Sequence, residues 1–307
     1  MMSFQGRDLL SLADLSQTEL TDLIDLSARL KAGKLTPQCP NQVLGLIFNK
    51  ASTRTRVSFS VAMYQLSGQV IDLNANMTQI GRGEPTADTA RVLDRYVDVL
   101  AIRTYAQSEI EEFAQHAEIP VINALTDLEH PCQILADLLT VQEAFGTCAG
   151  LTLTYLGDGN NVAHSLMLGC ALIGINIRVA TPAGYEPSPA VVERARELSR
   201  DRSEVTITRD PQAAAQGAQA LYTDVWASMG QEDSAENRIP IFQPFQINSS
   251  ILGLADPEAI VLHCLPAHRG EEITEAVMEG RQSRIWDQAE NRMHAQKALL
   301  AAVLGAV

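Results

Sequence analysis

The sequence lacks any apolar run long enough to cross a lipid bilayer. Its longest uninterrupted apolar stretch, Leu166 to Ile175, falls far short of the ~20 residues that a membrane-spanning helix needs. The first residues, Met1 to Asp8, also lack the pattern of a secretory signal peptide. We therefore expect a cytoplasmic protein without a membrane partner.

Cysteine is scarce and has no metal-type spacing. The 5 cysteines are odd in number, and no two of them form a C-x-x-C pair. A disulfide framework would call for an even number of cysteines, and a zinc cluster would call for closely spaced pairs. We expect no metal, and we expect most of these cysteines to be ordinary buried thiols.

Positive charge is also in short supply, with 23 Lys and Arg against 37 Asp and Glu and a net charge of −14. Such a chain repels nucleic acid and anionic lipid, so a phosphate-bearing partner needs a local basic pocket. A large polyanion is excluded, whereas a small phosphorylated metabolite is compatible. The 46% hydrophobic and 20% charged residues are globular values. A length of 307 residues favours about two domains.

Short β-rich runs alternate with helical stretches along the whole chain, which predicts parallel sheets joined by right-handed crossovers. The first helix should begin at the capping box Ser16–Glu19 and run toward Lys31. The expected strands are 43–48, 70–73, 99–103, 120–125, 151–156, 177–180, 205–208, 220–225 and 260–264. The expected helices include 56–66, 87–96, 110–117, 133–145 and a final one at about 289–304.

The pattern restarts after the turn-rich segment 146–150, so we expect two doubly wound α/β domains, residues 1–146 and 151–307. Each should have a central parallel sheet flanked by helices. A hinge at 146–150 would put a cleft between them, and ligands of such folds bind at the carboxyl ends of strands.

Residues 50–56, Lys-Ala-Ser-Thr-Arg-Thr-Arg, directly follow an expected strand and open a helix. Helix amides, the hydroxyls of Ser52, Thr53 and Thr55, and the guanidiniums of Arg54 and Arg56 could converge on a phosphate. No glycine-rich turn is present, so this is neither a Walker loop nor a dinucleotide fingerprint. On spacing alone, a capped helix with solvated arginines explains the segment equally well.

Arg103 ends one expected strand, and His130 and Gln133 lie at the next strand-to-helix junction. Three polar donors at neighbouring strand ends could hold an anion and polarise an adjacent carbonyl, as an oxyanion hole does. The alternative for His130, which precedes a proline, is a structural turn residue.

In the second half, residues 157–161 (Gly-Asp-Gly-Asn-Asn) resemble a nucleotide-binding turn, but the third glycine of G-x-G-x-x-G is missing. Asp224 ends a strand and leads through Ser228 and Met229 into the polar loop 231–238, which could be a lid or a plain surface connection. Cys264 closes the last core strand, where inert packing competes with a role as proton acceptor.

Taken in order, Ser52–Arg56, His130–Gln133, Asp224 with Ser228–Gly230, and His263–Pro266 resemble the aspartate/ornithine transcarbamoylase family over nearly the whole chain. The first two motifs indicate carbamoyl phosphate, whereas Ser-Met-Gly and His-Cys-Leu-Pro indicate the ornithine branch. One departure is the run 266–272 after the last motif, where many relatives have a basic residue directly after the proline.

The resemblance implies a role for each matching residue. It assigns phosphate and carbamoyl binding to Ser52, Thr53, Arg54, Thr55, Arg103, His130 and Gln133, and it places Cys264 and Leu265 at the reacting end. It implies that Gln79 reaches a neighbouring subunit's carbamoyl phosphate site in a homotrimer. The last helix would return to the first domain and bring Arg292 to the carbamoyl phosphate site. Ornithine would contact Asn161, Asp224, Ser228 and Met229, with Asn160 as a substitute for Asn161 if the turn aligns one residue off.

The implied reaction is carbamoyl transfer from carbamoyl phosphate to the δ-amine of L-ornithine, in arginine biosynthesis and without a cofactor. Arg54, Arg103, His130, Cys264 and Asp224 would be catalytic. Aspartate and putrescine are the alternative acceptors. A catalytically silent relative and a nicotinamide-dependent enzyme are the alternatives of a different class, although the sequence has every motif residue and no complete glycine fingerprint.

Overall fold

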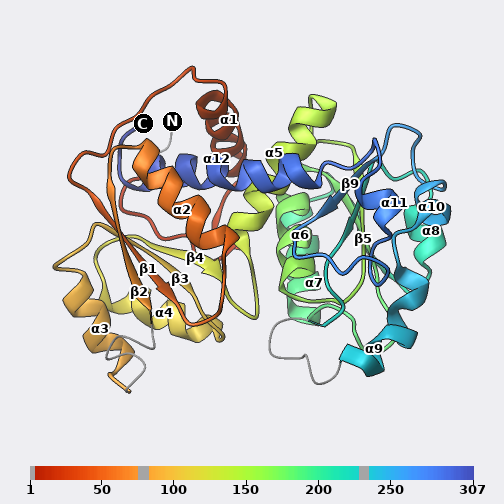
Figure 1. Ribbon diagram of the computed structural model, residues 1–307, viewed down its shortest axis with the longest axis horizontal. Coiled ribbons are helices and arrows are strands. Elements are labelled where there is room, and N and C mark those ends of the chain that lie inside the picture. The colour runs from red at the N-terminus through yellow and green to blue at the C-terminus, as the bar shows by residue number, and fades with distance from the viewer. Residues whose placement is uncertain (1–3, 75–82, 228–234) are drawn as a thin grey trace. The chain divides into compact units, whose positions relative to one another are not determined.

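The computed structural model describes residues 4–74, 83–227 and 235–307. The chain forms two compact units (Figure 1): unit 1 is Met1–Ala136 with Asn291–Val307, and unit 2 is Asp137–Glu290. Each unit contains one parallel sheet with helices around it. The predicted fold class is confirmed, including a C-terminal helix whose last part belongs to the first unit.

The sheet of unit 1 has the strand order β2-β1-β3-β4, and every pairing is parallel. The interior strands β1 and β3 and the edge strand β4 are almost wholly buried, as strands covered on both faces are. Its elements are η1 (Leu12–Asp14), α1 (Gln17–Lys31), β1 (Val43–Phe48), α2 (Arg54–Gln65), β2 (Gln69–Asn74), α3 (Thr86–Leu93), β3 (Val99–Arg103), α4 (Gln107–His116) and β4 (Val121–Leu125).

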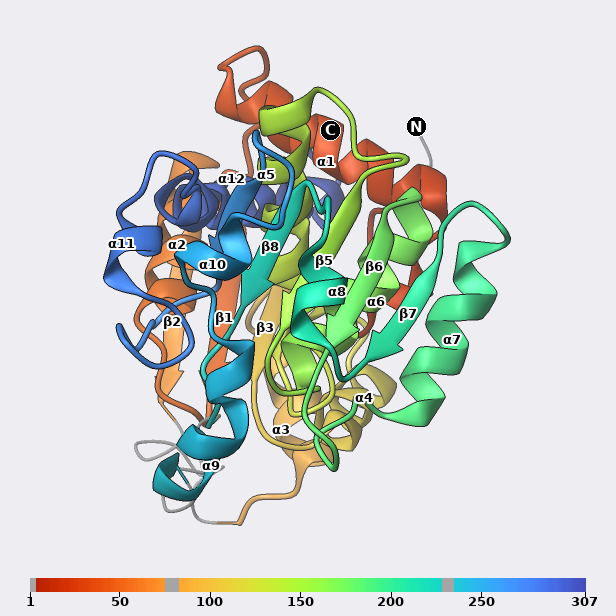
Figure 2. The same cartoon turned by 90° about the vertical axis from the view of Figure 1, so that its right-hand side faces the viewer.

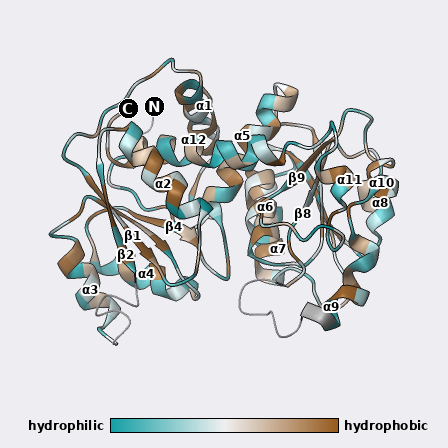
Figure 3. Ribbon diagram, viewed as in Figure 1, coloured by the Kyte–Doolittle hydropathy of each residue, from teal (hydrophilic) through white to brown (hydrophobic). Residues whose placement is uncertain are grey.

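The sheet of unit 2 is also parallel, in the order β7-β6-β5-β8-β9, and Figure 2 shows its strands side by side. Brown apolar strands run through both units in Figure 3. The elements of unit 2 are β5 (Thr152–Leu156), α6 (Asn161–Ile173), β6 (Asn176–Ala180), α7 (Pro189–Ser199), β7 (Val205–Thr208), α8 (Pro211–Ala215), β8 (Ala220–Thr223), α9 (Ala235–Phe242), η5 (Gln243–Phe245), α10 (Ser249–Leu252), β9 (Ile260–His263) and α11 (Glu275–Met278).

Two helices contain residues of both units, because the division between the units falls inside them. These are α5 (Pro131–Phe145) and α12 (Ile285–Val303). The predicted start of α12, at about Ala289, is wrong by four residues. Ile285 is fully buried in the core of unit 2, so the opening turn packs there while the later turns belong to unit 1.

The predicted capping box is confirmed at the start of α1. Ser16 Oγ accepts the N–H of Glu19 (3.2 Å), and the Glu19 carboxylate accepts the N–H of Ser16 (2.7 Å). All five cysteines are free, four of them buried and Cys264 half-buried, as expected for ordinary thiols. In the described part of the chain, no helix has the length and apolarity needed to span a bilayer.

Candidate active site

In unit 1, the residues predicted to bind an anion follow three adjacent strands. Phe48 at the end of β1 is in register with Arg103 at the end of β3, which in turn pairs with Leu125 at the end of β4. The segment 52–55 follows β1, and His130 follows β4. Because parallel strands end at the same edge of a sheet, these side chains belong to one edge of unit 1.

The helix α2 opens at this edge. Ser52 Oγ accepts the N–H of Thr55 (3.3 Å), whereas the Thr53 side chain makes no capping hydrogen bond. Arg54 is the first residue of α2 and is exposed, while Thr55 is buried. The opening amides of a helix have no acceptor within the helix and carry partial positive charge, so this terminus favours an anion.

Arg56 departs from the predicted convergence with Arg54. Its guanidinium forms an ion pair with Asp72 of β2, and it lies 4.9 Å from the centre of the Phe48 ring. Since the Asp72 carboxylate balances its charge, Arg56 is an anchor between α2 and β2 in this structure.

Arg292 of α12 reaches the same group of residues. Its Nη1 donates to Gln133 Oε1 (2.5 Å) and its Nη2 donates to Thr55 Oγ1 (3.0 Å). The exposed fractions of Arg292, Gln133 and Thr55 are 4%, 1% and 2%, so these contacts are shielded from water. The structure therefore brings together three predicted site residues that come from α12, α5 and α2.

His130 lies among guanidinium groups. Burial lowers the pKa of His130 well below its ordinary value, and the charges of Arg292, Arg103 and Arg54 lower that pKa further. The imidazole is therefore neutral at neutral pH. The positive potential of the group formed by Thr55, Arg54, Arg103, His130, Gln133 and Arg292, which we call the anion half-site, comes from its three arginines. A neutral imidazole still carries one N–H that can donate to a carbonyl oxygen.

The sequence reasoning missed Lys50 and Asp127 as site residues. The buried Lys50 ammonium forms an ion pair with Asp127 and lies 4.2 Å from the centre of the Tyr105 ring. This pair joins the loop after β1 to the loop after β4, so it fixes the two loops that carry residues predicted to bind an anion. The available signal was position, since each charge lies two or three residues before a motif, at Ser52 and at His130.

In unit 2, Asp224 directly follows β8 and Cys264 directly follows β9. Cys264 Sγ donates to Asp224 Oδ1 (2.9 Å), and the backbone N–H of Val225 donates to the same oxygen (2.8 Å). Asn160 Nδ2 donates to Asp224 Oδ2 (2.8 Å). The two predicted catalytic groups of this half are therefore in direct contact.

Asn160 caps a helix and also contacts Asp224. Asn160 is the N-cap of α6, where its Oδ1 accepts the N–H groups of Val162 and Ala163 (3.0 and 3.2 Å) while its Nδ2 holds Asp224. Both the oxygen and the nitrogen of the Asn160 side-chain amide thus form hydrogen bonds within the protein. Asn161 is the first residue of α6 and is half-buried, at the same strand edge.

Gly159 explains the resemblance of residues 157–161 to a nucleotide-binding turn. A Cβ at this position would lie 2.3 Å from the backbone N of Pro187 and 2.6 Å from the carbonyl oxygen of Tyr185. The Gly159 N–H donates to that same carbonyl (2.9 Å). Glycine is required here because two backbone segments pack against each other, and its amide is already used.

The sequence reasoning also missed a partly buried ion pair close to Asp224. Arg238 Nη1 donates to Asp158 Oδ2 and to the carbonyl oxygen of Trp226 (2.8 and 2.7 Å). Burial raises the pKa of Asp158, and the charge of Asp224 raises it too, whereas the bond to Arg238 lowers it. Arg238 therefore stabilises the charge of Asp158 and joins α9 to Asp158 and to the backbone of Trp226.

The backbone after β9 turns sharply. Leu265 has a φ of +59°, is followed by a cis bond to Pro266, and donates its N–H to His263 Nδ1 (2.9 Å). Because His263 Nδ1 is an acceptor, Nε2 carries the proton, and it lies 2.9 Å from Glu272 Oε1. The potential ligand atoms of Asp224, His263 and Cys264 come within 4.8 Å of one another, and both ring nitrogens of His263 are already engaged in contacts within the protein.

Three predicted site residues, Gln79, Ser228 and Met229, are outside the described residues.

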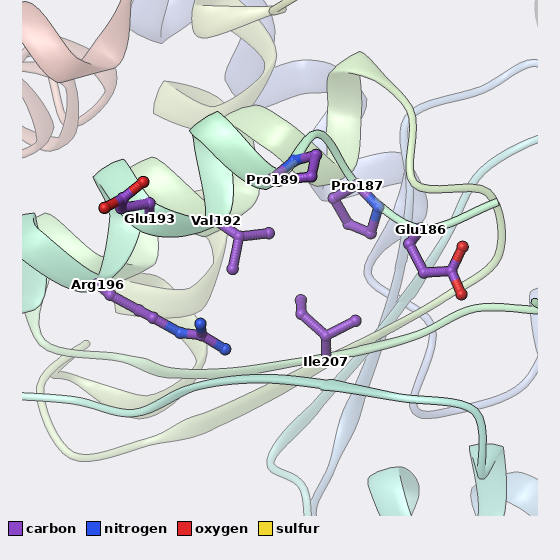
Figure 4. Close-up of a pocket in the computed structure, with 7 residues that line it drawn as sticks. All are labelled: Glu186, Pro187, Pro189, Val192, Glu193, Arg196 and Ile207. Atoms are coloured by element: carbon purple, nitrogen blue, oxygen red, sulfur yellow. The ribbon is translucent and has the colours of Figure 1, made fainter. Parts of the chain in front are cut away.

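A surface cavity of about 570 Å³ lies between α7 and β7, where Val192 and Ile207 point toward one another (Figure 4). None of its lining residues was predicted to be functional, and its Glu186 is paired with Arg209 at 2.8 Å.

The lowered pKa of His130 predicts how folding stability depends on pH. Its folded-state pKa lies below the unfolded value of ~6.5, so between these values the unfolded chain binds the proton more strongly. The stability contribution is therefore complete above pH ~6.5 and is lost as pH falls below it, by at most about 1.4 kcal/mol per pH unit.

We expect urea unfolding from pH 7 to 5 to show a steeper loss of stability for the wild-type protein than for His130→Gln. The exposed His268 offers a matched control, since His268→Gln should retain the wild-type slope. Equal slopes for the wild type and His130→Gln would contradict the assignment of a neutral, buried imidazole.

Comparison with known proteins identifies the family. Residues 7–143 match the aspartate/ornithine carbamoyltransferase carbamoyl-P binding domain, and residues 149–303 match the Asp/Orn binding domain of the same family. The chain is 70% identical over 306 residues to an ornithine carbamoyltransferase of Nostoc punctiforme, covering 100% of both chains.

Solved structures agree with this match. A crystal structure of ornithine carbamoyltransferase from Gloeobacter violaceus is 60% identical, with a TM-score of 0.90 over 97% of this chain and 98% of that one. The ornithine carbamoyltransferase from Pyrococcus furiosus is 47% identical, with a TM-score of 0.96 over 100% of both chains. The resemblance inferred from the motifs is thereby confirmed: the chain is a transferase and belongs to the aspartate/ornithine carbamoyltransferase family.

Proposed function

We propose that this chain transfers the carbamoyl group of carbamoyl phosphate to the δ-amine of L-ornithine, giving L-citrulline and phosphate. The observation that carries this proposal is the neutral His130 surrounded by the guanidiniums of Arg292, Arg103 and Arg54. Such a group attracts an anion and can still donate a hydrogen bond to a carbonyl. Carbamoyl phosphate presents both a phosphate and a carbonyl.

In the proposed mechanism, unit 1 binds carbamoyl phosphate. Ser52, Thr53 and Arg54, with the opening amides of α2, hold the phosphate. Thr55, Arg103 and His130 would donate to the carbonyl oxygen as it becomes an oxyanion, with Gln133 orienting the carbamoyl group. Donors fixed in advance at the position of the developing charge are an effective way to lower the barrier.

Unit 2 supplies the amine in this mechanism. The δ-amine of ornithine, with a pKa near ~10.4, is mostly protonated at neutral pH and must lose a proton before it attacks. Cys264 and Asp224, 2.9 Å apart, are the groups that would accept that proton. Asn161, Ser228 and Met229 would orient the rest of the substrate, and Leu265 would contact carbamoyl phosphate at the reacting end.

Attack of the amine on the carbonyl carbon forms a C–N bond. The bond between the carbonyl carbon and the bridging oxygen of the phosphate then breaks, and phosphate is released beside Arg54. The step needs no metal and no organic cofactor. Carbamoyl phosphate is a mixed anhydride, so transfer to an amine is downhill, which supports the citrulline-forming, biosynthetic direction in arginine metabolism. Five free cysteines fit a reducing compartment such as the cytoplasm.

We also propose a homotrimer, with Gln79 reaching a neighbouring subunit's site. An exposed apolar stripe on α2 supports self-assembly: Val57, Val61 and Tyr64 are 53%, 36% and 62% exposed. Ile71, 45% exposed, lies on the adjacent edge strand β2. A contiguous apolar surface of this kind usually marks an interface, and the stripe follows the anion-binding segment directly.

The acceptor specificity can be tested with purified protein, carbamoyl phosphate and an equimolar mixture of ornithine, aspartate and putrescine. We expect citrulline as the dominant product by mass spectrometry. Putrescine lacks the α-carboxylate and α-amine that Asn161, Asp224 and Ser228 would bind, and aspartate lacks the δ-amine that would attack. Carbamoyl-aspartate or carbamoyl-putrescine in place of citrulline would overturn the choice of acceptor while leaving the family intact.

Arg54→Ala tests the phosphate role in the same assay. Removing one preorganised charge at the leaving group should lower kcat by about 10²–10³. Arg56→Ala is the matched control, because Arg56 is already paired with Asp72, and it should retain much more activity. Equal losses in the two variants would show that Arg54 has no special role.

Assembly can be tested by light scattering of the full chain. We expect three times the mass of one chain for the wild type, and a smaller species when Val57 and Tyr64 are both replaced by aspartate. Tyr96→Asp, at a tyrosine that is 71% exposed elsewhere in unit 1, should keep the wild-type mass. A monomeric wild type would contradict the proposed trimer.

A further inference from the structure

The outer edge of β9 forms hydrogen bonds with the segment before α12 and with the first turn of that helix. This strand is the last in its sheet, so one of its edges has no neighbouring strand. The N–H of Val261 donates to the carbonyl of Gln282, and the carbonyl of Val261 accepts the N–H of Arg284, both at 2.9 Å. His263 lies two residues further and faces the same edge, where its N–H donates to Gln288 Oε1 (2.9 Å).

Gln288 is itself held rigidly. Its Nε2 donates to Asp137 Oδ1 of α5 (2.7 Å) and to the Tyr222 hydroxyl of β8 (3.2 Å). His263, Gln288, Asp137 and Tyr222 are each at most 1% exposed. Burial raises the pKa of Tyr222, and its hydrogen bond to Asp137 raises that pKa too, so the hydroxyl keeps its proton. The side chain of Gln288 is therefore fixed from two sides in a dry environment.

We propose that Gln288 and Asp137 are positioning residues for Cys264. Cys264 directly follows His263, whose N–H is the last backbone group of β9 to be held at this edge. On the other edge, His263 is in register with Thr223, the residue before Asp224. The contact between Cys264 Sγ and Asp224 Oδ1 at 2.9 Å thus depends on how the end of β9 is fixed.

This inference rests on the proposed function only for the role of Cys264 in turnover. The position of Cys264 can be measured without turnover, because it is half-buried while the other four cysteines are buried. Its alkylation by iodoacetamide, located by mass spectrometry, reports how firmly the hydrogen bond to Asp224 holds the thiol in place. Thiolate is the reactive form, so a loosened contact should raise the alkylation rate at fixed pH.

Three variants separate positioning from general stability. Gln288→Leu removes the acceptor of the His263 N–H. Gln288→Glu places a second carboxylate against Asp137, and adding Asp137→Asn restores a matched pair. The control is Gln296→Leu on the same helix, because Gln296 is 0% exposed and its amide has no hydrogen-bond partner among the described residues.

We expect Gln288→Leu and Gln288→Glu to alkylate Cys264 about threefold faster or more and to lower kcat by about 10- to 100-fold, with KM for carbamoyl phosphate unchanged. The double variant Gln288→Glu, Asp137→Asn should return toward wild-type values, and Gln296→Leu should match the wild type.

A folded Gln288→Leu protein that alkylates Cys264 at the wild-type rate would overturn the proposal, whatever its activity. If neither single variant folds, the double variant decides, since a folded double variant with an altered alkylation rate would overturn it. A wild-type protein that makes no citrulline would refute the proposed function and leave the alkylation comparison valid.

Discussion

The buried guanidinium of Arg292 is the constraint on which the anion half-site depends. An arginine keeps its charge in proteins, and a buried charge is costly unless hydrogen bonds satisfy it. Gln133 and Thr55 stabilise this guanidinium because their neutral oxygens accept hydrogen bonds from Nη1 and Nη2. Burial and the charges of Arg292, Arg103 and Arg54 keep the pKa of His130 low, and the positive potential of these arginines is available to a small anion.

Each of the helices α5 and α12 contributes two residues, one turn apart, to two separate groups of contacts. On α5, Gln133 and Asp137 are four residues apart, and on α12, Gln288 and Arg292 have the same spacing. Side chains at this spacing lie on one face of a helix. Gln133 with Arg292 belongs to the anion half-site, whereas Asp137 with Gln288 holds the strand that ends at Cys264.

The sequence predicted the parts of this structure that depend on local pattern. Apolar runs such as Val43–Phe48 and the capping box at Ser16 predict their elements well, because burial and capping act over a few residues. Residues at the ends of strands or directly after them, among them Arg103 and Asp224, could also be predicted, because parallel topology collects such residues at one edge of each sheet.

The partners of those residues could not be predicted from local sequence. Gln133 and Arg292 are 159 positions apart, and Asp137 and Gln288 are 151 apart, so no local pattern links them. Arg292 was identified only through the family resemblance, since the residues around it look like an ordinary helix. The ion pair of Arg56 with Asp72 was not predicted either, because it depends on how α2 packs against the neighbouring strand β2.

The net charge of −14 and the arginine cluster are compatible because the cluster is local. The central claim is that this cluster binds the phosphate of carbamoyl phosphate. A crystal structure grown with carbamoyl phosphate alone tests it most directly. The predicted result is a phosphate within hydrogen-bond distance of Arg54, Arg103 and the first amides of α2. A phosphate bound at another surface, with this edge of unit 1 empty, would contradict the claim.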